Sequence, residues 1–167
     1  MKRDHISFIF RGSRIDLAGF SPHATLLDWL RLNAHATGTK EGCGEGDCGA
    51  CTVVLSRASH GKLDPRPVNA CILLLGQVDG AEILTIEDLA EGEQLHPIQE
   101  AMVAHHGSQC GFCTPGIVMS LFALHQNAQA PVARPDVDAA LSGNLCRCTG
   151  YENIVTAVLA AAEEMRS

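Results

Sequence analysis

The residues of this chain best suited to chemistry are its eight cysteines. The first three, Cys43, Cys48 and Cys51, have the spacing C-x4-C-x2-C, and Cys71 follows further along the chain. This order and spacing is typical of the four thiolate ligands of a plant-type [2Fe–2S] cluster. Such a cluster is anionic, so backbone N–H groups directed at its sulfur atoms stabilise it. The sequence therefore predicts a first cluster site in the segment 43–71.

The loop that carries the first three cysteines is rich in glycine. Four glycines lie in it or beside it: Gly42, Gly44, Gly46 and Gly49. A loop that wraps around a cluster needs positive φ angles and a close backbone approach, and glycine allows both at the least steric cost. Residues 44–49 also match the dinucleotide fingerprint G-x-G-x-x-G, which should follow a strand and begin a helix. Here a predicted helix (25–36) comes first and a predicted strand (52–55) follows, so the pattern favours a cluster over a nucleotide.

The other four cysteines form two close pairs, C-x-x-C and C-x-C. They are Cys110, Cys113, Cys146 and Cys148. Each pair precedes a predicted helix start, at Thr114-Pro115 and at Thr149-Gly150. If these helices pack side by side with their N-termini level, the four thiolates converge on two positive helix ends, which favour negative charge and lower the thiol pKa. The pairs therefore predict a second four-thiolate site.

Zinc and disulfide bonds are the alternative uses of these cysteines. Two close cysteine pairs can form a four-thiolate zinc site, although C-x-C is tighter than the usual zinc spacing, so the spacing favours iron–sulfur over zinc. Residues 1–10 lack the apolar core of a secretory signal, so a cytoplasmic location is expected. In that compartment the cysteines are expected to bind metal rather than to form disulfides. Because the cysteines divide into four and four, the histidines, His105 and His106 included, are expected at surface or capping positions.

The composition argues against nucleic-acid binding and against a membrane-spanning helix. The chain has 167 residues, enough for one domain or two small ones, and a net charge of −7 without a basic run. The absence of a basic patch argues against nucleic acid as a partner. No stretch approaches the ~20 apolar residues of a membrane-spanning helix, so no membrane span is predicted.

The hydrophobic pattern changes near residue 85. Before it, strand-like runs at 6–10, 14–18, 52–55 and 82–85 surround one helical segment. The segment 57–67 contains Gly61, Pro65 and Pro67 and is expected to be a loop. Trp29, the only tryptophan, is expected in the core. After the change, four helical patterns begin near residues 96, 114, 135 and 149 and predict a small helical bundle. The predicted fold class is α+β, with domains at 1–85 and 86–167.

Four motifs resemble the iron–sulfur portion of the molybdenum hydroxylases, the xanthine dehydrogenase and aldehyde oxidoreductase family. They are residues 38–43 (GTKEGC), 46–53 (GDCGACTV), 109–116 (QCGFCTPG) and 143–151 (GNLCRCTGY). The resemblance covers essentially the whole chain and favours iron over zinc at the second site. It implies an N-terminal β-grasp domain similar to plant-type ferredoxins, followed by an all-α four-helix domain, each with one [2Fe–2S] cluster.

The resemblance also implies a function. In that family, electrons pass from a molybdenum–pterin site through the helical-domain cluster and the ferredoxin-like cluster to FAD. Molybdopterin and FAD would lie on partner subunits, a large molybdenum subunit and an FAD-binding subunit, in a dimer of heterotrimers or heterodimers. Cys148 would bind iron and lie against the pterin amino group, and Gln109 would contact the molybdenum cofactor. The chain would thus transfer electrons, without bond chemistry of its own, in an oxidoreductase acting on an N-heterocycle such as xanthine or another purine.

Two sets of motifs resemble different branches of the family. Residues 96–102 (HPIQEAM), residues 107–109 (GSQ) and the long 51–71 segment resemble the xanthine dehydrogenase branch. Residues 151–155 (YENIV) and the chain end near residue 167 resemble the separate small subunits of three-subunit enzymes. The small subunit of an aldehyde or carbon monoxide type dehydrogenase, and a stand-alone ferredoxin-like electron carrier, are therefore the alternatives.

Overall fold

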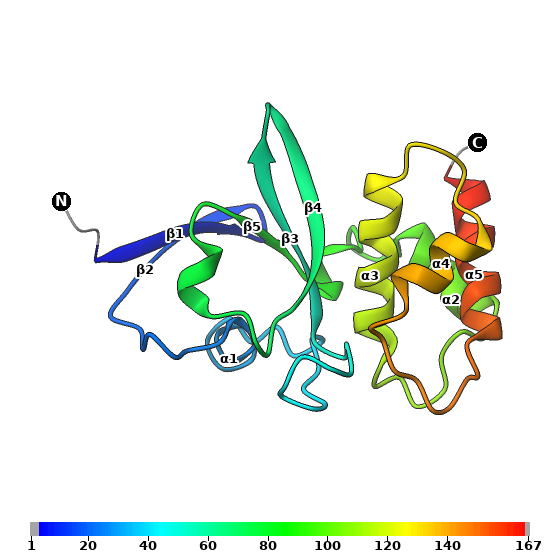
Figure 1. The fold of residues 1–167 in the computed structure, drawn as a ribbon, viewed down its shortest axis with the longest axis horizontal. Coiled ribbons are helices and arrows are strands. Elements are labelled where there is room, and N and C mark those ends of the chain that lie inside the picture. The colour runs from blue at the N-terminus through cyan, green and yellow to red at the C-terminus, as the bar shows by residue number, and fades with distance from the viewer. Residues whose placement is uncertain (1–3, 166–167) are drawn as a thin grey trace.

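The computed structural model describes residues 4–165 of the chain, which form a five-stranded sheet followed by a group of helices (Figure 1). The strands are β1 (His5–Phe10), β2 (Ser13–Ala18), β3 (Thr52–Ser59), β4 (Lys62–Asn69) and β5 (Glu82–Leu84). The α-helices are α1 (Leu26–Asp28), α2 (Pro97–Ala104), α3 (Thr114–Asn127), α4 (Arg134–Ala140) and α5 (Glu152–Glu164). A π-helical turn (Trp29–Asn33) extends α1, and two 3-10 turns cover Leu75–Val78 and Ile86–Asp88. The fold is mixed α+β, as the sequence predicts.

The sheet has the strand order β2-β1-β5-β3-β4. β1 pairs with β2 and β3 pairs with β4 as antiparallel hairpins, and the short β5 joins the two hairpins, parallel to β1 and antiparallel to β3. Trp29 packs edge-on against Phe8 and Phe10, with ring centroids 5.0 and 5.3 Å apart. The prediction that Trp29 lies in the core is confirmed, since its side chain is buried.

The expectation of a loop at 57–67 is wrong. These residues complete β3 and form most of β4, and the turn between the two strands falls at His60 and Gly61. Pro65 and Pro67 lie opposite Ser56 and Val54 of β3. A proline cannot donate a ladder hydrogen bond, but on an edge strand its nitrogen can face away from the sheet at little cost. β4 is such an edge strand, so the prolines are compatible with it.

The four helices that follow share an apolar cluster. Its fully buried members include Ile98 on α2, Ile117 and Leu121 on α3, and Ile154 on α5. α2 packs against α5, and α3 packs against α4. Pro97 is the first residue of α2. The backbone N–H at this position has no partner within a helix, so a proline, which lacks an N–H, costs no hydrogen bond there.

Two helix boundaries differ from the prediction. The first helical segment was expected over 25–36 and ends at Asn33. The last helix was expected to begin at Thr149-Gly150 and begins instead at Glu152, because Tyr151 has a left-handed φ of 67° that interrupts the helix start. The loop that contains the last two cysteines is therefore longer than the sequence suggests.

The sheet and the helices meet along one face of α3. α3 packs against β3 and β4, and Figure 1 shows this helix between the β3–β4 hairpin and the other helices. Val54 on β3 is fully buried and belongs to the apolar cluster of the helices. Among the residues that the structure describes, no helix is both long and apolar enough to cross a membrane.

Candidate metal centres

The loop before β3 directs backbone amides at the sulfur of Cys43. The N–H groups of Glu45, Asp47 and Cys48 donate to Cys43 Sγ at 3.5, 3.3 and 3.4 Å. These bonds, with the largest effect from Glu45, lower the pKa of Cys43 to about 6. The thiolate is the form that binds metal, so the loop prepares Cys43 as a ligand at neutral pH.

Glycine makes this loop possible in two ways. Gly44, Gly46 and Gly49 have φ angles of 71°, 80° and 70°, which side chains rarely tolerate. Gly42 lacks a positive φ, but a Cβ atom there would lie 2.7 Å from Cys48 Sγ. The glycines thus serve both the backbone turn and the close approach to a sulfur, as the sequence predicts.

The first four thiols lie close to one another. Cys43 interacts with Cys48, and Cys51 interacts most with Cys71 and also with Cys48. Cys51 and Cys71 are buried at the end of the loop and just after β4. Burial, which disfavours the charged form, raises the pKa of Cys51 to about 12.

The second four thiols also lie close to one another. Cys110 Sγ and Cys148 Sγ lie 3.7 Å apart at the surface, and Cys113 interacts most with Cys146 and also with Cys110. Burial raises the pKa of Cys113 to about 12. Burial acts the same way on Cys146, but hydrogen bonds from Thr149, Cys113 and Cys148 together outweigh it and hold the pKa of Cys146 below its usual value.

Each set of four thiols matches the ligand set of a [2Fe–2S] cluster. In a [2Fe–2S] cluster the four ligands are divided between two irons. All eight cysteines are unbridged thiols, so both sets fit the binding of such a cluster.

The two cysteine pairs of the second set differ in their relation to helices. Cys113 is the N-cap of α3, as the sequence predicts. Cys148 does not adjoin a helix start, since three residues separate it from α5, and that prediction is wrong. Tyr151 holds this loop instead: its hydroxyl accepts a hydrogen bond from Cys146 N at 2.6 Å and donates to Asn144 O at 2.8 Å. Tyr151 is the only tyrosine of the chain, and no pattern in the sequence predicts this role for it.

The other predicted residues lie at the surface or at the ends of α2. Gln109 is exposed and directly precedes the exposed Cys110. His96 caps α2, because its Nδ1 accepts a hydrogen bond from Ile98 N at 3.2 Å, and burial lowers its pKa. His105 and His106 follow the end of α2.

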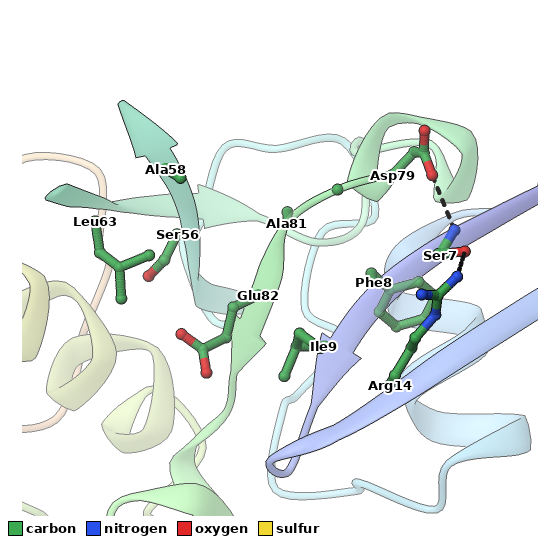
Figure 2. Close-up of a pocket in the computed structure, with 11 residues that line it drawn as sticks. Ser7, Phe8, Ile9, Arg14, Ser56, Ala58, Leu63, Asp79, Ala81 and Glu82 are labelled. Carbon is green, nitrogen blue, oxygen red and sulfur yellow. Dashed lines mark hydrogen bonds between the residues drawn. The ribbon is translucent and has the colours of Figure 1, made fainter. Parts of the chain in front are cut away.

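A groove of about 520 Å³ lies beside β5, between β1 and the β3–β4 hairpin, and none of the eight cysteines lines it (Figure 2). Three of its polar residues bind one another. Ser7 N donates to Asp79 Oδ1 at 2.8 Å, and Arg14 Nη2 donates to Ser7 Oγ at 3.1 Å. We therefore locate the chemistry of this chain at its cysteines.

Two sequence families match the chain in the same order as the two cysteine sets. A family described as "2Fe-2S iron-sulfur cluster binding domain" matches residues 17–75, which contain the first set. A family described as "[2Fe-2S] binding domain" matches residues 85–159, which contain the second set.

Curated relatives are much longer than this chain. A xanthine dehydrogenase of Emericella nidulans is 47% identical over 92% of the chain, which corresponds to 11% of the relative. Aldehyde oxidase 4 of Cavia porcellus is 44% identical over 91% of the chain and 12% of the relative. The chain thus spans about a tenth of the length of such relatives.

Solved structures show the same fold at similar identity. An aldehyde oxidoreductase of Desulfovibrio gigas matches 97% of the chain with a TM-score of 0.86 and 39% identity, over 17% of that protein's chain. A chain of quinoline 2-oxidoreductase from Pseudomonas putida 86 matches with a TM-score of 0.83 and 38% identity, over 97% of this chain and 95% of that one. A match over nearly the full length of both chains, together with two iron–sulfur families in the right order, shows that the chain belongs to the molybdenum hydroxylase family, of which it is the [2Fe–2S]-binding part.

Proposed function

We propose that this chain carries electrons between a molybdenum–pterin site and FAD on partner subunits or domains. The observation that carries the proposal is the direct connection of its two cysteine sets: Leu145 N, next to Cys146, donates to Cys48 O at 2.9 Å. Bound [2Fe–2S] clusters supply one-electron transfer at each set. The chain supplies ligands, charge stabilisation and a fixed separation between the two sets.

The proposed ligands follow the two observed sets. Cys43, Cys48, Cys51 and Cys71 would hold one cluster, and Cys110, Cys113, Cys146 and Cys148 would hold the other. The amides that donate to Cys43 Sγ would stabilise negative charge at the first cluster. We assign residues 1–85 to a β-grasp domain and residues 86–167 to a four-helix domain. The five-stranded sheet and the two matched families at 17–75 and 85–159 support this division.

The surface near Cys110 and Cys148 supports a lasting interface rather than a stand-alone carrier. Phe112 and Leu145 are 47% and 56% exposed beside these cysteines. Large exposed apolar side chains grouped at one site favour a protein–protein contact. Gln109 is exposed on the same loop as Cys110, which supports the proposal that Gln109 and Cys148 contact the molybdenum cofactor of a partner.

The proposed substrate of the whole enzyme is an N-heterocycle such as xanthine or another purine. Relatives named xanthine dehydrogenase and the structure named quinoline 2-oxidoreductase support this class. An aldehyde is the second candidate, supported by the relatives named aldehyde oxidase and aldehyde oxidoreductase. We further propose a cytoplasmic location, since eight unbridged thiols suit a reducing compartment. The proposed assembly is a dimer of heterotrimers or heterodimers.

Metal analysis and electron paramagnetic resonance (EPR) of the reduced, purified protein test the proposal. We expect about four irons per chain and two distinct [2Fe–2S] signals. Zinc in place of iron, or a single iron–sulfur signal, would contradict it. Purification from the native source distinguishes an enzyme subunit from a stand-alone carrier. Only an enzyme subunit is expected to copurify with molybdenum and flavin. Assay of that complex with xanthine and with an aldehyde then distinguishes the two substrate classes.

A further inference from the structure

A row of four polar side chains crosses the junction between the sheet and the helices. It runs from Ser120 on α3 through Asn144 and Thr52 to Asn69 on β4. Ser120 Oγ donates to Asn144 Oδ1 at 2.7 Å, and Asn144 Nδ2 donates to Thr52 Oγ1 at 3.4 Å. Thr52 Oγ1 lies 3.3 Å from Asn69 Oδ1. Ser120, Asn144 and Thr52 are at most 5% exposed.

This row also binds the backbone of the first cysteine loop. Asn144 Nδ2 and Thr52 Oγ1 both donate to Gly49 O, at 3.1 and 2.8 Å, and Asn69 Nδ2 donates to Gly46 O at 2.6 Å. Gly46 and Gly49 flank Cys48 on either side. Because a buried polar group that loses its partner costs free energy, the row favours one arrangement of this loop.

The same row reaches the other cysteine segments. Asn69 lies two residues before Cys71, and Asn144 lies two residues before Cys146. The fit around Asn144 is tight, since a Cβ atom on Gly49 would lie 2.5 Å from Asn144 Nδ2. Asn144 therefore fixes the position of its own loop relative to the loop of the first set.

We propose that Asn144 is a positioning residue that sets the separation and orientation of the two cluster sites. It touches no thiol, but it fixes the loop in which Leu145 N donates to Cys48 O. The hydroxyl of Thr52 and the hydroxyl of Ser120 orient its amide. This inference rests on the proposed function, because it requires a cluster at each cysteine set.

The test compares Asn144→Ala with Asn127→Ala in the cluster-loaded chain. Asn127 also joins the two parts, with its Nδ2 donating to Pro65 O at 2.6 Å, but it lies at the far end of α3 from Cys113. Two reduced clusters at a fixed short distance split each other's EPR signals by spin–spin interaction. We expect Asn144→Ala to lose or change this splitting while it keeps about four irons and both signals. Asn127→Ala should keep the native splitting.

An isosteric pair at Thr52 covers the case in which Asn144→Ala does not load both clusters. Thr52→Val removes the hydroxyl with little change of shape, and Thr52→Ser keeps the hydroxyl. We expect the splitting to change in Thr52→Val and to be native in Thr52→Ser.

Four results would overturn the inference. The first two are native splitting in an Asn144→Ala protein that holds both clusters and native splitting in Thr52→Val. The other two are an equal change in Asn127→Ala and two signals without any splitting in the unmodified protein. A lack of iron–sulfur signals in the unmodified protein would instead refute the proposed function.

Discussion

The backbones of Gly49 and Gly116 are in direct contact: a Cβ atom on Gly116 would lie 2.0 Å from the carbonyl oxygen of Gly49. Gly116 lies in the first turn of α3, three residues after Cys113, and Gly49 lies between Cys48 and Cys51. The first turn of α3 thus packs directly against the loop that contains Cys48 and Cys51. This contact keeps the two cysteine sets close together.

Gly116→Ala should destabilise the protein. Alanine favours a helix over glycine by up to ~1 kcal/mol. Here the added methyl group meets the Gly49 backbone, and overpacking of this kind costs roughly 1–3 kcal/mol. We therefore expect a net loss of unfolding free energy, measured by urea denaturation. Gly143→Ala is the control, because a Cβ atom there meets nothing within 4 Å. A Gly116→Ala protein as stable as Gly143→Ala would contradict the expectation.

In the metal-free protein, Cys43 should be the first of three compared thiols to react with iodoacetamide at pH 7. Its pKa of about 6 makes it mainly thiolate, whereas Cys51 and Cys113 have pKa values of about 12. Since the thiolate is the reactive form, labelling of Cys43 should slow as the pH falls through 6. Peptide mass spectrometry measures the order. Equal labelling rates for Cys43 and Cys51 at pH 7 would show that the loop amides do not activate Cys43.

Each cysteine set should lose its cluster independently of the other. Cys71→Ser removes a ligand of the first set, and Cys146→Ser removes a ligand of the second. We expect each variant to keep about half of the iron and one of the two EPR signals. If either substitution abolished both signals while the protein stayed folded, the division of the cysteines into these two sets would be wrong.

The stability of the protein should fall as the pH decreases below about 6.5, partly because of His125. Its Nε2 is buried without a hydrogen-bond partner among the described residues, and burial, followed by the charge of His96, lowers its pKa. At pH values between the lowered pKa of His125 in the folded protein and its ordinary pKa in the unfolded chain, the unfolded chain binds more protons than the folded protein. A fall in pH through this range therefore favours unfolding.

His125→Leu should reduce this dependence on pH, because leucine stays uncharged. The measurement is the midpoint of thermal unfolding, recorded from pH 7.5 down to pH 5.5 for both proteins. The slope should be smaller in His125→Leu, although His96 still contributes to it. An unchanged slope would assign the effect to other groups.

The sequence was most informative where the determinants are local. The C-x4-C spacing predicts that Cys43 and Cys48 lie close together, and prolines mark the starts of α2 and α3. The β3–β4 hairpin was missed because Pro65 and Pro67 suggest a loop unless β4 is known to be an edge strand.

Contacts between distant parts of the chain were beyond the sequence. Asn144 and Gly49 are 95 residues apart, and nothing in either neighbourhood indicates that they bind each other. Tyr151 was likewise not recognised as the residue that holds the last cysteine loop. Its φ of 67° and its two hydrogen bonds depend on how that loop folds back towards Asn144.

Val54 limits how this chain can be divided or recombined. The residue belongs to a strand, yet its fully buried side chain fills a space in the apolar cluster of the helices. A cut near residue 85 would leave a hole in the helical part and an uncovered apolar side chain on the sheet. A chimera that takes its ferredoxin-like part from one relative and its helices from another therefore has to match the size of residue 54 to the helices it receives.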